Sequence, residues 1–276
     1  MRAQAWLTGL SGRRRIFAAA VLVLVVVLVA VFTVRLSTGS ADPTSGSPAQ
    51  NRPGTVLLVP GYGGSTGSLS TLATRLRATG RTAEVVTLPG DGTGDLLAQV
   101  ATLDHAVNDV LAGGAPSVDV VGYSAGGVVT RLWVDRDAGA NRARRVVTLG
   151  SPLHGTQVAA AGTALVPGAC PLACQQLVPN SSLLREIDAQ ALPVGLPWLS
   201  LWTQDDQTVT PPDSARLSGA VNVPLQQVCP TLQVSHSGLP TDALVTGLVL
   251  ADLNGPTLTT PPQASQCTAL TRTGLR

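Results

Sequence analysis

Short runs of apolar residues alternate with segments of helical periodicity between residues 55 and 253. The first run, TVLLVP at residues 55–60, is continuous, as expected of a strand that is buried on both faces. Similar runs follow at residues 83–90, 117–123, 144–150, 198–204 and 220–226. Because strands that alternate with helices pair in parallel, the pattern predicts an α/β fold with a mostly parallel sheet covered by helices on both faces.

The segments between these runs predict the helices and one insertion. Helical periodicity is found at residues 69–78, 95–114, 124–136, 181–192 and 240–253. Residues 151–197 are too many for a simple crossover, and they lie where a lid or a substrate-shaping element would sit. A long crossover with no role in substrate access is the alternative.

The N-terminus predicts a membrane anchor. Arg13, Arg14 and Arg15 precede residues 16–34, an apolar stretch without charge that is long enough to span a bilayer. The basic flank should stay in the cytoplasm, which sends the rest of the chain outward. The only nearby cleavage site, after Ala41, is poor, so an uncleaved signal-anchor is favoured over secretion after cleavage. Both alternatives place the remaining chain outside the cytoplasm.

Composition divides the chain into four parts. Residues 1–36 are the predicted basic flank and transmembrane helix, and residues 37–54 are rich in Ser, Pro, Gly and Thr, as in a flexible linker. Residues 55–253 form the predicted folded domain. Residues 254–276 are rich in Pro and Thr and are expected to be irregular.

The charge distribution argues against a nucleic-acid partner. The formal net charge is +2, and part of it comes from the N-terminus. Arg142, Arg144 and Arg145 form the only other basic cluster, and no aromatic side chains interleave with it.

The four cysteines follow the predicted anchor. An even number in an exported chain predicts two disulfides, for which three connectivities exist. Cys170–Cys174 is favoured as a local pair, and Cys229–Cys267 would then tie the C-terminal tail to the domain. A metal site is disfavoured because the chain has no paired C-x-x-C spacing and no nearby His with ligand spacing.

The motif Gly-Tyr-Ser-Ala-Gly follows the third apolar run and opens a helical segment. This context is that of a nucleophile elbow, in which a sharp strand-to-helix turn exposes the hydroxyl of Ser124. Gly122 and Gly126 remove Cβ atoms where strand and helix nearly collide, and the helix N-terminus favours negative charge. A plain strand–helix turn is the alternative reading.

Acyl transfer at such a serine needs donors for an oxyanion. The backbone N–H of Ala125, the residue after Ser124, is one predicted donor. The loop VPGYGGS at residues 59–65 follows the first strand, and its best donor is the N–H of Tyr62.

A serine nucleophile also needs a base, and the chain has three histidines. His105 lies inside a helical segment and is expected at the surface. His154 follows a strand but precedes every acid candidate. His236 lies in a loop before the last helix, which fits the chain order of serine, acid and histidine in α/β-hydrolases. That order leaves Asp205 and Asp206 as acids.

The chain resembles small bacterial secreted lipases and esterases of the α/β-hydrolase superfamily over about residues 55–250. The resemblance rests on LLVPGYGGS, VVGYSAGG, VVTLGSPLHGT, TQDDQTVTPPDSARL and VSHSGL. It implies the α/β-hydrolase fold and a triad of Ser124, His236 and Asp206, the last in a D-x-x-V turn. It also implies that His154 is not catalytic. This chain departs from many relatives by having Pro60-Gly61 in place of His-Gly at the oxyanion loop.

Together these features predict a lipase-like carboxylic ester hydrolase that forms an acyl-enzyme and requires no metal or organic cofactor. An acyl ester or lipid is the expected substrate, and the protein is expected to be a monomer. An acyltransferase or thioesterase of the same fold, acting on envelope lipids, is the first alternative. A membrane-tethered binding module without activity is an alternative of another class.

Overall fold

The computed structural model describes residues 21, 23, 25, 48–137, 139–166 and 168–276. The predicted anchor at residues 1–36 therefore lies almost wholly outside the described residues, as does most of the predicted linker. Among the residues that are described, no helix has the length and apolar character needed to cross a membrane. Residues 47–276 form one unit, and the following description concerns that unit.

The centre of the unit is a six-stranded sheet in which every strand pairing is parallel. The strand order is β2-β1-β3-β4-β5-β6. The strands are β1 (Thr55–Val59), β2 (Ala83–Val85), β3 (Val118–Tyr123), β4 (Ala143–Leu149), β5 (Trp198–Trp202) and β6 (Val221–Pro224). The carboxyl ends of β1, β3, β4 and β5 meet at one edge of the sheet, where ligands of such folds bind.

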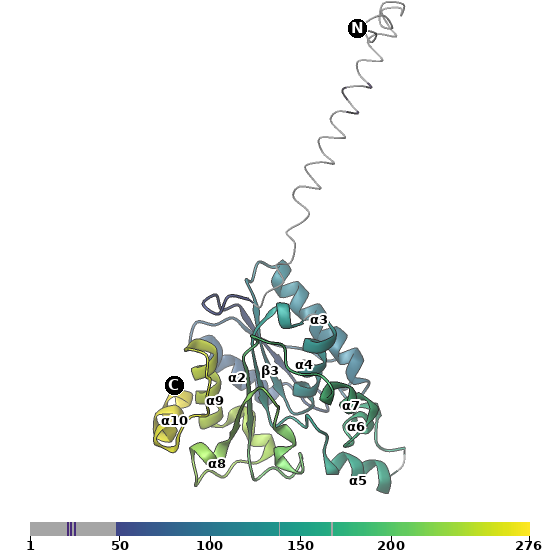
Figure 1. Ribbon diagram of the computed structural model, residues 1–276, viewed down its shortest axis with the longest axis vertical. Coiled ribbons are helices and arrows are strands. Elements are labelled where there is room, and N and C mark those ends of the chain that lie inside the picture. Colours follow the sequence, from purple (N-terminus) through teal and green to yellow (C-terminus); the bar gives the residue numbers. More distant parts are fainter. Residues whose placement is uncertain (1–20, 22, 24, 26–47, 138, 167) are drawn as a thin grey trace, which may run out of the picture. The chain divides into compact units, whose positions relative to one another are not determined.

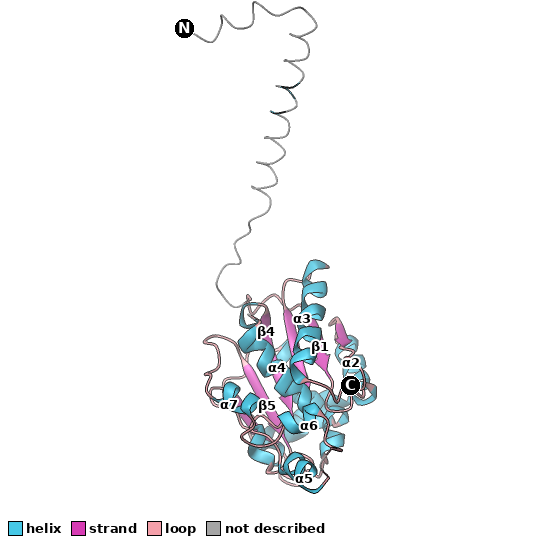
Figure 2. Ribbon diagram, turned by 90° about the vertical axis from the view of Figure 1, so that its right-hand side faces the viewer, coloured by secondary structure: helices cyan, strands magenta, loops and turns pink. Residues whose placement is uncertain are grey.

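Helices cover both faces of the sheet, as the alternating pattern predicted (Figures 1 and 2). They are α2 (Gly67–Ala78), α3 (Leu96–Ala112), α4 (Ala125–Arg136), α5 (Gln157–Leu165), α6 (Leu172–Gln176), α7 (Ser182–Asp188), α8 (Leu225–Val228), α9 (Ala243–Asn254) and α10 (Cys267–Leu275). Successive strand residues face opposite sides: Leu57 belongs to the buried cluster that includes α3 and α4, and Leu58 to the cluster that includes α2 and α9. The domain therefore has two hydrophobic clusters, one on each face of the sheet, as strands that are buried on both faces require.

The second strand is followed closely by a turn, as predicted. A strand and a turn were predicted over residues 83–90; β2 covers Ala83–Val85, and a turn follows at residues 89–92. In that turn the N–H of Gly92 donates to the carbonyl of Pro89 at 3.2 Å, and Gly90 and Gly92 have φ values of 61° and 71°. Because proline lacks an N–H and the glycines adopt a left-handed conformation, the chain leaves the sheet here.

The expectation of an irregular tail is wrong for residues 267–275, which form α10. This helix lies directly against α9, because a Cβ atom on Gly247 would come 2.0 Å from the carbonyl oxygen of Leu270. A Cβ atom on Gly274 would come 1.8 Å from the carbonyl oxygen of Ala243. Two glycines thus permit a backbone contact that the Pro- and Thr-rich composition did not reveal.

Both cysteine pairs are disulfide-bonded in the structure. Cys170 and Cys174 are linked with a Cα–Cα distance of 5.4 Å, and Cys229 and Cys267 with 5.3 Å. The second bond spans 38 residues of sequence, and in the chain-entropy model a loop of that size contributes about 4 kcal/mol to stability. It joins the segment after α8 to the start of α10, and so ties the tail to the domain.

The insertion at residues 151–197 contains α5, α6 and α7, where a single helical segment over 181–192 was predicted. Of that segment only residues 182–188 are helical, since the chain turns at residues 189–190 and then continues through Pro193 and Gly195 toward β5. The local disulfide holds α6 to the residues before it. The role of the insertion as a lid or as a plain crossover stays a prediction.

Candidate active site

Ser124 occupies a strained turn between β3 and α4. Its backbone angles are φ 52° and ψ −126°, a conformation that residues other than glycine rarely adopt. A Cβ atom on Gly122 would come 2.6 Å from the Cα of Gly127, and one on Gly126 would come 2.3 Å from the carbonyl oxygen of Val59. The two motif glycines therefore lie where strand and helix leave no room for a side chain.

The structure brings Ser124, His236 and Asp206 together in one hydrogen-bonded chain. The distance from His236 Nε2 to Ser124 Oγ is 2.9 Å, and that from His236 Nδ1 to Asp206 Oδ2 is 2.7 Å. An imidazole with the proton on Nδ1 donates to the carboxylate and accepts from the hydroxyl. All three residues are buried, with 8%, 8% and 4% of their surfaces exposed in the order serine, histidine and aspartate.

The turn after β5 distinguishes the two neighbouring aspartates. Asp206 Oδ1 accepts hydrogen bonds from the backbone N–H groups of Thr208 at 2.9 Å and Val209 at 2.8 Å, and Val209 is buried. This leaves Asp206 Oδ2 free to face the imidazole. Asp205 is exposed, and its Oδ2 accepts a hydrogen bond from Gln226 at 3.2 Å instead. Its side chain is not brought to His236.

The loop after β1 passes next to the elbow. A Cβ atom on Gly61 would come 2.9 Å from the Cβ of Ser124, so the two backbones are close. Within the described part of the chain, neither the N–H of Tyr62 nor that of Ala125 donates a hydrogen bond to the protein. These two N–H groups, one in the elbow and one in the adjacent loop, have no protein acceptor among the described residues.

The sequence and the fold are similar to those of known lipases. Residues 97–233 match the family model Lipase (class 2). The structure is similar to that of Aspergillus fumigatus lipase B, with a TM-score of 0.65 and 20% identity over 85% of this chain and 59% of that chain. It is also similar to Bacillus licheniformis lipase BlEst2 in mature form, with a TM-score of 0.60 and 18% identity over 75% of this chain and 94% of that one. The chain has the α/β-hydrolase fold.

The first of these lipases is considerably longer, since the present chain spans 59% of its length. A bromoperoxidase from Bacillus anthracis is also similar, with a TM-score of 0.52 and 14% identity over 73% of this chain and 92% of that chain. Among curated proteins, none matches the sequence. The bromoperoxidase illustrates that the fold hosts several chemistries. The class 2 lipase match is what supports a serine ester hydrolase.

One side chain at the α/β-hydrolase elbow was missed by sequence reasoning. The ring of Tyr123 lies 5.2 Å from the imidazole of His236, centroid to centroid, and its hydroxyl donates to the carbonyl of His236 at 3.2 Å. Burial, together with the negative charge of Asp206, raises the pKa of the Tyr123 phenol to about 12. Tyr123 therefore remains a donor at neutral pH and fixes the backbone that carries the imidazole.

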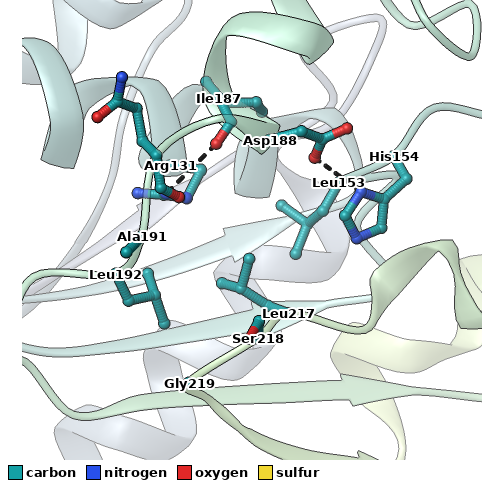
Figure 3. Close-up of a pocket in the computed structure, with 11 residues that line it drawn as sticks. Arg131, Leu153, His154, Ile187, Asp188, Ala191, Leu192, Leu217, Ser218 and Gly219 are labelled. Atoms are coloured by element: carbon teal, nitrogen blue, oxygen red, sulfur yellow. Dashed lines mark hydrogen bonds and ion pairs between the residues drawn. The ribbon is translucent and has the colours of Figure 1, made fainter.

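The other two histidines, His105 and His154, lie apart from the hydrogen bonds that join Ser124, His236 and Asp206. His105 is exposed on α3. His154 contacts Asp188 through Nδ1 at 2.7 Å and the carbonyl of Arg216 through Nε2 at 2.9 Å (Figure 3). It thereby connects the end of α7 to the loop before β6, which is a structural contact.

His154 also lines a cavity of about 210 Å³ between α4, α7 and the segment before β6 (Figure 3). Its walls are Arg131, Leu153, His154, Ile187, Asp188, Gln190, Ala191, Leu192, Leu217, Ser218 and Gly219. The guanidinium of Arg131 is occupied, because it pairs with Asp135 and donates to the carbonyl of Gln190 at 2.7 Å. No member of the Ser124–His236–Asp206 chain lines this cavity.

Proposed function

We propose that this chain hydrolyses carboxylic esters in the manner of a lipase, through an acyl-enzyme formed on Ser124. The observation that supports this most is the continuous hydrogen-bonded chain from Ser124 Oγ through His236 to Asp206 Oδ2. Nucleophile, base and orienting acid are within hydrogen-bond reach of one another, and each is held by a different loop at the carboxyl edge of the sheet.

In the proposed reaction, Ser124 Oγ attacks the ester carbonyl carbon while its proton passes to Nε2 of His236. Asp206 accepts the Nδ1–H, which holds the imidazole in its tautomer and stabilises the imidazolium. The proton on Nε2 then goes to the leaving alcohol oxygen as the tetrahedral intermediate collapses. Water, deprotonated by the same imidazole, attacks the acyl-enzyme and releases the carboxylic acid and Ser124.

The N–H groups of Tyr62 and Ala125 are the proposed oxyanion donors. Ala125 directly follows Ser124, Gly61 directly before Tyr62 lies against Ser124, and neither N–H has another acceptor in the described residues; these observations support this role. Negative charge on the oxyanion also lies at the N-terminus of α4, where the helix dipole is favourable. No step of this reaction uses a metal or an organic cofactor.

The proposal places the catalytic domain outside the cytoplasm. Two disulfides support an oxidising compartment, and the charge-free stretch in the first 36 residues is proposed to anchor the chain or to direct its secretion. Residues 37–54 are then the linker, residues 55–253 the catalytic domain and residues 254–276 a tail tied back by a disulfide. The substrate is proposed to be an acyl ester or lipid, and the domain a monomer.

The test is hydrolysis of p-nitrophenyl esters with acyl chains from C2 to C16 by the purified full-length chain. We expect turnover in the presence of EDTA, with a preference among chain lengths that identifies the substrate class. An acyltransferase would instead release the same phenol faster when an alcohol is added and would form the new ester, detectable by mass spectrometry. Absence of activity on every ester and thioester offered would favour a binding module and would contradict the proposal.

A further inference from the structure

The loop that carries Tyr62 rests on a second loop, residues 90–94. The N–H of Gly63 donates to the carbonyl of Gly92 at 3.4 Å. A Cβ atom on Gly92 would come only 2.5 Å from the backbone nitrogen of Gly64, and Gly92 has a φ of 71°. The two backbones therefore touch without intervening side chains, and movement of the second loop would move the first.

The second loop is held by the buried side-chain amide of Gln99. Gln99, in the first turn of α3, is 1% exposed, and its Nε2 donates to the carbonyls of Gly92 at 3.2 Å and Gly94 at 3.3 Å. A glutamine is rarely buried so completely unless its polar atoms are paired. The carbonyl of Gly92 thus accepts from Gln99 on one side and from the Tyr62 loop on the other.

Helix α6 of the insertion also makes hydrogen bonds to the second loop and to the start of α3. The N–H of Ala173 in α6 donates to the carbonyl of Thr93 at 3.1 Å. Gln176 accepts from the N–H of Leu96 at 2.8 Å and donates to Asp95 at 2.7 Å. Because these contacts still hold the loop at Thr93 and just after it, removal of the Gln99 contact is expected to shift the loop without unfolding it.

We infer that Gln99 is a positioning residue that aligns the backbone N–H of Tyr62 with the substrate oxyanion. The inference rests on the proposed function. The inference accounts for the presence of Pro60-Gly61 where many relatives have His-Gly at the oxyanion loop. In this chain the loop is supported by residues 90–94 and by the side-chain amide of Gln99. Gln99 does not touch the substrate, and it acts through the carbonyl of Gly92.

The first test replaces Gln99 by Met in the full-length chain, which keeps the length of the side chain and removes its N–H donors. Complete loss of an oxyanion donor costs roughly 10²- to 10³-fold in kcat, so a misplaced donor should cost about 10- to 100-fold. KM for the ester should stay within about twofold, because the contact matters mainly in the transition state. Affinity for an alkyl boronic acid, which forms a tetrahedral adduct with serine, should fall by the same factor as kcat/KM.

A second variant, Gln99→Glu, separates positioning from general destabilisation. As a carboxylate it has no donor for the carbonyls of Gly92 and Gly94, whereas as a neutral acid it has one. Burial raises the pKa of such a carboxyl. The ratio of variant to wild-type kcat should therefore rise as the pH is lowered from 8 to 6. A merely structural role predicts no such recovery when both proteins remain folded.

Asp104→Asn is the matched control on the same helix. Asp104 accepts hydrogen bonds from Trp133 Nε1 at 3.0 Å and from Arg142, away from the oxyanion loop. The Asp104→Asn substitution should lower the melting temperature while leaving kcat and boronate affinity unchanged. The inference is overturned if Gln99→Met keeps kcat and boronate affinity within twofold of those of an active wild type. It is also overturned if Asp104→Asn lowers kcat and boronate affinity as much as Gln99→Met does. A wild type that turns over no ester and binds no boronate would overturn the proposed function as well.

Discussion

Replacement of Ser124 by alanine is expected to reduce kcat on p-nitrophenyl esters by about 10⁴-fold or more, because a serine nucleophile and its base act as a unit. The hydroxyl is the only group removed, and the hydrogen bond of 2.9 Å to His236 Nε2 is lost with it. The fold should persist, since the buried clusters on both sheet faces do not depend on this hydroxyl. Steady-state kinetics, with circular dichroism on the same samples, measures both effects.

Ser151→Ala provides the matched control for that experiment. Ser151 also lies just past a strand end and is fully buried, but its Oγ has no hydrogen-bond partner among the described residues. Loss of this hydroxyl should change kcat by less than about threefold, because no paired group is left behind. Retention of a tenth or more of wild-type kcat in Ser124→Ala, or an equal loss in Ser151→Ala, would contradict the assignment of the nucleophile.

Asp206→Asn is expected to lower kcat by about 10⁴-fold, the loss known for the corresponding substitution in serine proteases. The amide can donate to Nδ1 of His236, which favours the tautomer with the proton on Nε2 and removes the acceptor that Ser124 needs. The variant side chain keeps nearly the same shape, so the turn through Thr208 and Val209 should remain. Measuring both kcat and the melting temperature separates an effect on the tautomer of His236 from a loss of the fold.

Asp205→Asn is the neighbouring control. Asp205 is exposed and contacts Gln226 rather than the imidazole, so its replacement should cost roughly tenfold or less in kcat. A larger loss in Asp205→Asn than in Asp206→Asn would move the acid one residue upstream. Equal small losses in both would place the acid elsewhere in the chain.

The architecture was predictable because the strands are buried on both faces. The run at residues 56–59 is apolar on both faces, which excludes an exposed antiparallel sheet and requires helices on both sides. The positions of Ser124, Asp206 and His236 were predictable for a related reason: each follows a strand or precedes the last helix, where the topology brings loops to one edge. The distances between their side chains required the structure.

Features that depend on contacts between loops were not predictable. The sequence around Gln99 reads as an ordinary helix, and nothing in its periodicity reveals that the amide meets the carbonyls of Gly92 and Gly94. Tyr123 was visible only as the variable residue of the elbow motif, although it contacts His236. The helix α10 was not predicted because its packing depends on a backbone contact with Gly247 in α9. In each case a contact formed only in the folded chain, and not the local periodicity, decides the role.

The central claim, that Ser124 is the nucleophile, is tested most directly by covalent labelling of the full-length chain with a fluorophosphonate and mass spectrometry of its peptides. Attack by Ser124 Oγ on phosphorus, with proton transfer to His236 and loss of fluoride, should leave one phosphonyl group per chain. We predict that the adduct lies on Ser124 and that Ser124→Ala abolishes it while Ser151→Ala does not. An adduct on another residue, or labelling of Ser124→Ala at the wild-type rate, would contradict the account.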